Sequence, residues 1–186
     1  MPVIKLIKKS YDTADSIYKL IHYIFDICKT SYDEKRPGHM LGDFSGCAKF
    51  FGSDMQAIQP EFVSAQIIAN NMVYDKTEEN LMKHRVISFS ELEYVTPDEA
   101  LVLARYIATA YGENYITAYG VHLDTNYIHI HLAINTIGWR DGKRFDISFE
   151  MKWLWAMVNG WLRSRDERFR NDPKSWNHNL GYYGTW

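Results

Sequence analysis

The chain has 186 residues, of which 46% are hydrophobic and 24% charged, so its composition is that of a folded globular protein rather than a disordered one. Its formal net charge of −2 excludes a uniformly basic surface, so any attraction to phosphate groups has to be local. There is no apolar run of the length that membrane insertion needs, no signal-peptide pattern at the N-terminus, and only two cysteines, Cys28 and Cys47, so we expect one cytoplasmic domain without a disulfide framework.

The first half of the chain is predicted to contain one strand and two helices. Residues 3–8 read as the strand, and residues 12–30 as a helix that Asp12 or Thr13 caps. The core-facing stripe of that helix is predicted to consist of Ile17, Leu20, Ile21, Ile24, Phe25 and Cys28. Residues 31–59 are rich in Gly and Pro and are predicted to be mostly loop. The second helix, residues 60–74, is predicted to have a stripe of Phe62, Ala65, Ile68, Ala69 and Met72.

The second half alternates strands and helices. Residues 84–93 read as a strand, and Thr96, Pro97 and Glu99 begin a helix that ends at Gly112. Two strands follow, at 115–124 and from 127 onward, and then a turn at 140–143 and a long helix at 149–169. Residues 171–186 are predicted to be an irregular tail. These elements predict an α+β fold with a central antiparallel β-sheet and flanking helices, forming a single domain over residues 1–186.

The densest group of polar side chains lies between His122 and Asn135, which enclose the sequence Leu-Asp-Thr-Asn-Tyr-Ile-His-Ile-His-Leu-Ala-Ile. Side chains of a strand alternate between its two faces, so His129, His131 and Asn135 share one face and the Ile and Leu residues share the other. The apolar face is suited to a core. The histidine face is too polar to be buried without a purpose.

A tight turn at residues 125–126 would join the two strands as an antiparallel hairpin. In that register His122 lies opposite His129 and diagonal to His131. A lone His on a strand is usually structural, but three imidazoles on one rigid face predict a divalent-metal site. Asp124, on the same face at the hairpin end, is a candidate either to orient a ligating histidine or to accept a proton, and its alternative is a turn-initiating Asp.

Tyr23 lies on the first predicted helix, well outside the core-facing stripe. A structural tyrosine is expected within that stripe, so Tyr23 is a candidate nucleophile. Tyr18 at the edge of the stripe is interpreted as packing, and Tyr11 and Tyr32 are weaker candidates. Thirteen tyrosines make an exposed one unremarkable, so this assignment depends on the metal motif.

At these residues the sequence resembles the relaxases, the mobilisation nucleases of the MobA/VirD2-like type within the HUH endonucleases. His129-Ile130-His131 resembles the histidine pair of that group, with His122 as a third ligand. Residues 21–30 resemble the family's tyrosine helix, which ends in Lys-Thr, and residues 84–89 resemble its central strand. The resemblance runs from about residue 3 to about residue 147.

The resemblance implies a metal-dependent enzyme that nicks one DNA strand at an origin of transfer for conjugative mobilisation. Tyr23 would attack and form a 5′-phosphotyrosyl intermediate that is later rejoined, and the histidines would hold Mg2+, Mn2+ or another transition metal. Asn135 and His84 are supporting candidates, the former as a hydrogen-bond donor or DNA contact. The implied partners are single-stranded DNA, accessory relaxosome proteins and coupling proteins, in a bacterial cytoplasm.

Three other interpretations remain open. A rolling-circle replication initiator uses the same histidine pair, but its tyrosine usually follows the histidines, whereas Tyr23 precedes them. A small metal-dependent hydrolase or a cupin-like enzyme could also use the His-x-His pair, but it would have more short strands and no use for Tyr23. A non-catalytic DNA-binding or metal-binding module would use the histidines for structure only. Local basic groups occur at Lys5, Lys8 and Lys9 and again between Arg163 and Lys174.

Overall fold

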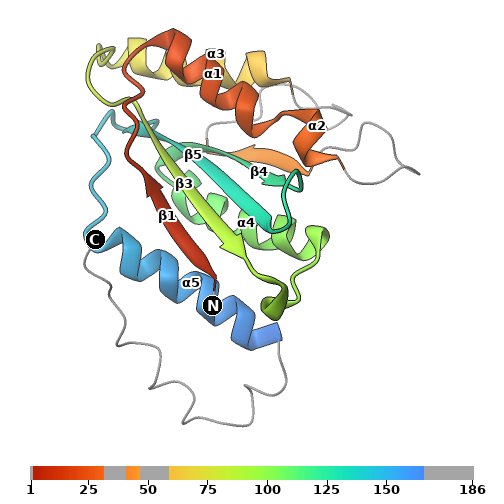
Figure 1. The fold of residues 1–186 in the computed structure, drawn as a ribbon. Helices are drawn as coiled ribbons and strands as arrows, with labels where there is room; N and C mark the ends of the chain where they lie inside the picture. Colours follow the sequence, from red (N-terminus) through yellow and green to blue (C-terminus); the bar gives the residue numbers. More distant parts are fainter. Residues whose placement is uncertain (1, 32–40, 47–58, 166–186) are drawn as a thin grey trace. The chain divides into compact units, whose positions relative to one another are not determined.

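Five antiparallel strands form one sheet in the order β1-β3-β5-β4-β2 in the computed structural model, which describes residues 2–31, 41–46 and 59–165. The strands are β1 (Val3–Ile7), β2 (Gly42–Ser45), β3 (Met82–Phe89), β4 (Tyr115–His122) and β5 (Ile128–Gly138). β5 pairs with β3 on one side and with β4 on the other, so it lies at the centre of the sheet (Figure 1). The predicted α+β fold with a central antiparallel sheet is confirmed.

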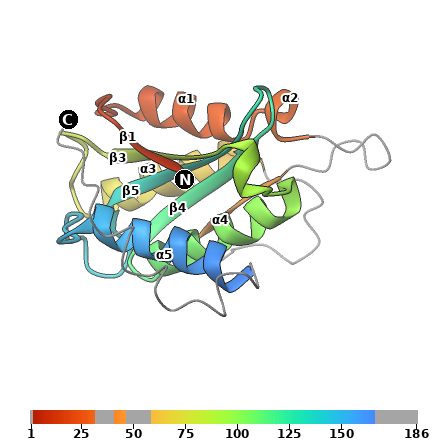
Figure 2. The same ribbon diagram turned by 60° about the horizontal axis from the view of Figure 1, so that its bottom comes forward.

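Helices cover both faces of this sheet (Figures 1 and 2). On one face lie α1 (Ala14–Ile24) and α3 (Pro60–Val73), and on the other lies α4 (Pro97–Gly112). Two short helices complete this part of the chain, α2 (Ile27–Thr30) and the 3-10 helix η1 (Glu91–Glu93). The caps of α1 and α4 are those expected from the sequence, because Thr13 accepts from the backbone N–H of Ser16 and Thr96 accepts from that of Glu99.

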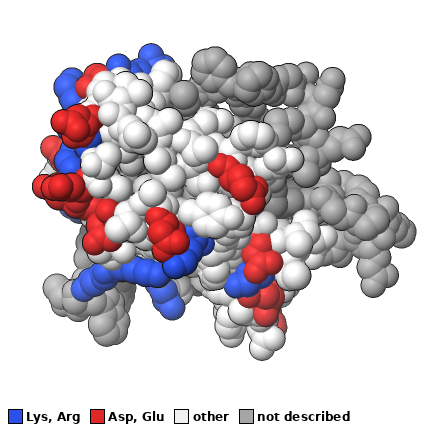
Figure 3. Space-filling view, turned by 90° about the horizontal axis from the view of Figure 1, so that it is seen from above, with Lys and Arg blue, Asp and Glu red and all other residues white. Residues whose placement is uncertain are grey.

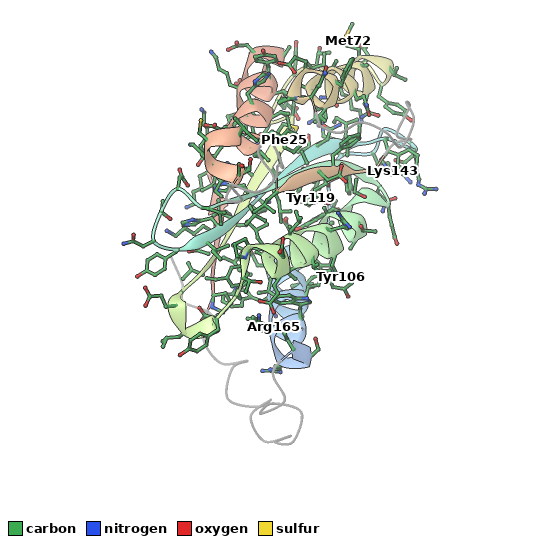
Figure 4. The ribbon with its side chains drawn as sticks, turned by 90° about the vertical axis from the view of Figure 1, so that its right-hand side faces the viewer. Phe25, Met72, Tyr106, Tyr119, Lys143 and Arg165 are labelled. Carbon is green, nitrogen blue, oxygen red and sulfur yellow. The ribbon has the colours of Figure 1, made fainter. Side chains whose placement is uncertain are left out.

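The alternation of side chains along β4 and β5 decides which residues meet which helix. Ile116, Ala118 and Ala133 pack with the buried side chains of α1 and α3 in one apolar cluster. The opposite face meets α4, where Arg105 donates to the hydroxyl of Tyr119 at 3.4 Å. Figure 4 shows Phe25 directed from the end of α1 toward the sheet, in agreement with its 4% exposure. The histidines of the motif have the parity of Ala118 and Ala133, and therefore face α1.

The predicted helix over residues 12–30 is wrong in one respect, because it is two helices. Phe25 ends α1, and Asp26 then caps α2 by accepting a 3.0 Å hydrogen bond from the backbone N–H of Cys28. The stripe calculated for one continuous helix therefore fails beyond Phe25. Cys28, predicted to face the core, is exposed.

Three further boundaries and the buried face of α3 differ from the sequence predictions. β4 ends at His122 and β5 begins at Ile128, so five residues join these strands in place of the predicted tight turn at 125–126. Residues 42–45, predicted as loop, form the edge strand β2, and the predicted strand over 84–93 ends at Phe89, where η1 follows. In α3 the buried residues are Val63, Ser64, Ile67 and Asn71, whereas Phe62 and Met72 of the predicted stripe are exposed. Met72 is labelled on the outer side of α3 in Figure 4.

The chain divides into two compact units, Met1–Ile147 and Ser148–Trp186. The described part of the second unit is α5 (Glu150–Arg165). The single domain over residues 1–186 stays a prediction, and the predicted tail at 171–186 lies outside the described residues. None of the helices within the described ranges combines the length and the apolar character needed to cross a membrane.

Candidate active site

Three neighbouring strands bring four histidines to the sheet face that α1 covers. His122 is the register partner of His129, and His131 is the partner of Gly120, which makes His131 a diagonal neighbour of His122 as predicted. His84 on β3 has Ala133 as its partner and so is a diagonal neighbour of His131 from the other side. The ring centroid of His131 lies 4.2 Å from that of His122, 5.2 Å from that of His84 and 6.2 Å from that of His129.

His122 is held by the end of α1. Its Nε2 donates a 3.0 Å hydrogen bond to the backbone carbonyl oxygen of Ile24, because a carbonyl can only accept. In the neutral ring this leaves the lone pair on Nδ1, which is buried and has no hydrogen-bond partner among the described residues. A buried nitrogen with a free lone pair is the state that a metal ligand requires.

His129 has a tautomer fixed by the hairpin loop. The hydroxyl of Thr125 donates to the backbone carbonyl of Tyr127 at 2.9 Å, so its single proton is already used. The 3.2 Å contact between Thr125 Oγ1 and Nδ1 of His129 must then be donated by the imidazole. The lone pair of the neutral His129 ring is consequently on Nε2.

His131 is held by another histidine instead of by the backbone. Its Nδ1 lies 2.9 Å from Nε2 of His84, and Nδ1 of His84 lies 3.1 Å from the hydroxyl oxygen of Tyr11. His84 therefore lies in the histidine cluster, and its supporting role stays a prediction. Tyr11, a weaker nucleophile candidate in the sequence analysis, lies in the segment before α1 and contacts His84. Its side chain is only 4% exposed.

Burial keeps all four imidazoles neutral at neutral pH. Burial is the largest cause of the lowered pKa of each ring, and it outweighs the raising effect of the Asp124 carboxylate on the pKa values of His122 and His129. For His131, burial and then the neighbouring histidines lower the pKa to about 2. For His84, burial and then His122 lower the pKa to about 4. Neutral imidazoles are the form that binds metal ions.

Tyr23 lies against this cluster at the last turn of α1. Its ring centroid is 5.1 Å from that of His122, 5.3 Å from that of His131 and 6.2 Å from that of His84. The side chain remains 39% exposed, so one side contacts the histidines and the other is open to a substrate. Tyr18 lies on another side of the same helix, where its ring packs on that of His22 with the centroids 4.0 Å apart.

A glycine allows α1 to come this close. Gly120 lies on β4 beside His131, and a Cβ atom at this position would overlap the carbonyl oxygen of Ile24. The same carbonyl accepts the hydrogen bond from His122, and Tyr23 is the preceding residue. Sequence analysis missed Gly120, although a glycine two residues before a candidate ligand in a strand is a signal of close backbone approach.

Asp124 lies close to Lys29. Its Oδ2 is 3.8 Å from Nζ of Lys29, and that ammonium group lies 4.2 Å from the ring centroid of Tyr23. The Asp124 carboxylate also raises the pKa values of His122 and His129, so both roles of Asp124 stay predictions. Lys29 was not singled out from the sequence except as part of the Lys-Thr ending of the helix.

Asn135 lies at the far end of the histidine face and is fully buried. Its Oδ1 accepts a 3.4 Å hydrogen bond from the backbone N–H of Ile137, and its Nδ2 has no hydrogen-bond partner within the described part of the chain. A side chain without exposed surface is poorly placed for a DNA contact. The donor role of Asn135 stays a prediction.

The donor set at this site fits a divalent cation chemically. Three imidazoles converge, two of them with a protein partner that leaves the outer nitrogen free, and one free nitrogen is buried without a hydrogen-bond partner in the described structure. As the side chains stand, no group of three or more His, Cys, Asp or Glu residues in the described ranges forms a metal-ion site. A cation at His122, His129 and His131 would therefore require the rings to rotate from these positions.

Comparisons with known proteins identify the family of the chain. A model of the family "Relaxase: MobA/VirD2-like, nuclease domain" matches residues 43–159. "Protein rlx" of Staphylococcus aureus is 28% identical over 120 residues, which are 64% of this chain and 32% of that protein. The matched segment thus spans about a third of the relative's length. No solved structure shows a significant match.

Proposed function

The chain belongs to the family of MobA/VirD2-like relaxase nuclease domains, and from this premise we propose that Tyr23 nicks one strand of DNA at an origin of transfer and becomes covalently attached to it. The observation that carries the proposal is the position of Tyr23. Its ring contacts those of His122, His131 and His84 while the side chain keeps 39% of its surface exposed. The family membership establishes a relaxase nuclease, and the tyrosine chemistry is our proposal.

In the proposed reaction the phenol oxygen of Tyr23 attacks the scissile phosphorus. A bond from phosphorus to the tyrosine oxygen forms, and the bond from phosphorus to the 3′ oxygen of the preceding nucleotide breaks. The products are a 5′-phosphotyrosyl DNA end and a free 3′-hydroxyl, which takes its proton from solvent. One phosphodiester replaces another, so the reverse reaction can rejoin the strand. The phenol proton passes to the Asp124 carboxylate, directly or through water.

Lys29 assists the same step. Its ammonium group lies 4.2 Å from the Tyr23 ring centroid and 3.8 Å from the Asp124 carboxylate, so it lies between the proposed nucleophile and the proposed proton acceptor. A positive charge at this place stabilises the negative charge that develops on the phenol oxygen during attack. It also holds Asp124 near the tyrosine.

His122, His129 and His131 would hold a divalent cation, for which we propose Mg2+ or Mn2+. When bound, such an ion polarises a non-bridging oxygen of the scissile phosphate and orients the phosphate for in-line attack. The protein contributes neutral imidazoles, because burial lowers the pKa of each ring. The hydrogen bonds to Ile24 and Thr125 also set which nitrogen of His122 and of His129 carries the lone pair.

Single-stranded DNA is the proposed substrate, and lysines around the histidines supply the local positive charge that the overall charge of −2 does not. Lys5 lowers the pKa of His129, Lys9 that of His84, and Lys29 those of His122 and His131, in each case less than burial does. These lysines are therefore near the cluster. Figure 3 views the molecule from the side of α1 and α3, where Lys and Arg are interspersed with Asp and Glu.

We further propose that this activity serves conjugative mobilisation in the bacterial cytoplasm, together with accessory relaxosome and coupling proteins. The support is the family alone, and the relative from Staphylococcus aureus is about three times as long as the segment it shares with this chain. Modest intrinsic DNA affinity, as expected from the charge balance, is consistent with a need for accessory proteins.

The test uses a labelled single-stranded origin-of-transfer oligonucleotide from the element that encodes the chain, with Mn2+ or Mg2+. We expect a DNA–protein adduct that survives denaturation with the wild type and with Tyr18→Phe, and none with Tyr23→Phe. Tyr18 is a matched control, because it is an exposed tyrosine of the same helix outside the histidine cluster. Asp124→Asn is expected to form the same adduct more slowly, by about 10- to 100-fold.

The same assay separates the other interpretations. Cleavage without an adduct, unaffected by Tyr23→Phe, would indicate a hydrolase. Loss of structure on metal removal, with no effect of Tyr23→Phe on any activity, would indicate a metal-stabilised binding module. A rolling-circle initiator would form the adduct at an origin of replication in place of an origin of transfer.

A further inference from the structure

A buried row of side chains leads from Tyr11 through His84 to His131. The hydroxyl of Tyr11 lies 3.1 Å from Nδ1 of His84, and Nε2 of His84 lies 2.9 Å from Nδ1 of His131. The three side chains are 4%, 6% and 7% exposed. A neutral imidazole carries one proton, so each ring in this row donates through one nitrogen and accepts through the other.

Two proton arrangements satisfy the same atomic positions. In the first, Tyr11 donates to His84, His84 donates to His131, and the remaining proton of His131 is on Nε2. In the second, His131 donates from Nδ1 to His84, His84 donates from Nδ1 to the Tyr11 oxygen, and Nε2 of His131 carries a lone pair. The second alone lets His131 bind a cation through Nε2 while both hydrogen bonds are kept.

The other two candidate ligands have no such freedom. The carbonyl of Ile24 can only accept, so the His122 ring must donate to it. The hydroxyl of Thr125 already donates its proton to the carbonyl of Tyr127, so the His129 ring must donate to that hydroxyl. His122 and His129 therefore present lone pairs in every arrangement. His131 differs, because its partner can donate or accept.

We propose that His84 and Tyr11 are positioning residues that hold His131 with its proton on Nδ1, so that Nε2 completes a three-imidazole cation site. The inference rests on the proposed metal function. His84 acts through His131 and Tyr11 acts through His84, and neither side chain has to touch DNA or the cation. Tyr11 thereby has a function distinct from that of Tyr23, although both tyrosines lie within 6.3 Å of the His84 ring, centroid to centroid.

Substitutions of His84 separate hydrogen bonding from packing. His84→Gln keeps an oxygen that can accept from Nδ1 of His131, whereas His84→Leu fills the space without an acceptor. Partners of this kind typically contribute 10- to 100-fold to metal affinity. We expect His84→Leu to weaken Mn2+ binding by about 100-fold, Tyr11→Phe by about tenfold, and His84→Gln by less than His84→Leu.

The first measurement is calorimetric titration of the full chain and these variants with Mn2+ at pH 7.5, with thermal unfolding monitored by circular dichroism. His84→Gln and Tyr11→Phe keep the test valid if His84→Leu does not fold. Equal affinity of the wild type, Tyr11→Phe and His84→Leu would overturn the positioning role and leave the metal site standing. A wild type that binds no Mn2+ would overturn the metal site, and the inference with it.

The second measurement detects the proton itself. In 15N-labelled protein loaded with Zn2+, a diamagnetic probe, the imidazole 15N shifts of His131 should show a protonated Nδ1 and a metal-bound Nε2. His84 should show a protonated Nδ1 in the same sample. Coordination of Zn2+ through Nδ1 of His131, or a proton on its Nε2, would contradict the proposal, and a role of His84 in packing alone predicts no difference between His84→Gln and His84→Leu.

Discussion

Nε2 of His122 donates a 3.0 Å hydrogen bond to the carbonyl oxygen of Ile24, and this bond joins the histidine strands to the end of the tyrosine helix. Tyr23 precedes Ile24, so the bond that fixes the tautomer of His122 also fixes the position of the proposed nucleophile. The position of the proposed metal ligand His122 and that of the proposed nucleophile Tyr23 are therefore coupled. Changes at the contact between α1 and β4 should affect both.

Gly120→Ala tests this coupling. Its Cβ atom would overlap the Ile24 carbonyl oxygen, so α1 has to move away from β4 and carry Tyr23 with it. We expect a loss of about 1–3 kcal/mol in the free energy of unfolding and a loss of about tenfold or more in the rate of adduct formation. Denaturant unfolding and single-turnover gel assays measure the two effects.

Gly160→Ala is the control for Gly120→Ala. Gly160 lies within α5, and a Cβ atom there meets no atom within 4 Å. Alanine is favoured over glycine in a helix, so we expect unchanged adduct formation and a gain of at most about 1 kcal/mol. Equal behaviour of the two variants would show that the close approach at Gly120 has no role in the site.

Chelation of divalent metal should abolish adduct formation and leave the fold intact. The apolar core between the sheet, α1 and α3 consists of buried side chains such as Ile21, Ile67 and Ile116, each at 0% exposure. This packing does not depend on a metal ion. We expect an unchanged circular dichroism spectrum with EDTA at pH 7.5 and full recovery of activity with added Mn2+. Unfolding by EDTA would instead favour the metal-stabilised binding module.

The stability of the metal-free protein should fall with decreasing pH. Burial lowers the pKa of His84 to about 4, whereas in the unfolded chain a histidine titrates near about 6.5. Between these values the unfolded chain binds more protons than the folded chain. The free energy of unfolding should therefore decrease from pH 6.5 toward pH 4, by up to about 1.4 kcal/mol per pH unit for each such histidine.

Denaturant unfolding in EDTA at pH 7, 6 and 5 measures this effect, and His84→Gln isolates the contribution of one ring. The variant lacks one titrating imidazole, so its stability should depend less steeply on pH than that of the wild type. Burial and the neighbouring histidines lower the pKa of His131 to about 2. Its contribution to the decrease in the free energy of unfolding therefore continues below pH 4. A stability that rises on acidification through this window would contradict the burial of neutral histidines.

Lys5 and Lys9 should contribute to DNA affinity without base specificity. Both lysines lie close enough to the histidines to lower their pKa values, so a phosphate in the site would be near them. Lys5→Gln combined with Lys9→Gln is expected to weaken binding of any single-stranded oligonucleotide and to reduce the salt dependence of log Kd by about one to two. Lys19→Gln, where the lysine pairs with Asp15 on α1, is the control and should bind as the wild type does.

The central part of the site was predictable because a strand has a strict period of two. The interleaved pattern of His129 and His131 with isoleucines decided which face holds the histidines, and the antiparallel hairpin placed His122 opposite His129 as predicted. The pairing is correct although the loop between the strands, residues 123–127, is longer than the predicted turn. The position of Tyr23 outside the helical stripe was also correct, since that stripe is regular as far as Phe25. These features depend on local spacing alone.

Contacts between distant segments could not be predicted in this way. Tyr11 reaches His84 across 73 positions of the chain, and no local pattern distinguishes it from the other twelve tyrosines. The buried stripe of α3 was wrong because apolar residues occur on several sides of that helix. Helical spacing is therefore consistent with more than one buried stripe on α3. Only the packing of the folded protein determines that Val63 and Ile67 are the buried residues.

The most direct test of the central claim is to identify the residue that carries the DNA. The adduct formed by the wild-type chain with its cognate oligonucleotide is digested with protease and nuclease, and the phosphonucleotide-bearing peptide is sequenced by mass spectrometry. We predict that the nucleotide is attached to Tyr23. Attachment to Tyr11, the other tyrosine beside His84, or to any further residue would contradict the assignment of Tyr23 as the nucleophile.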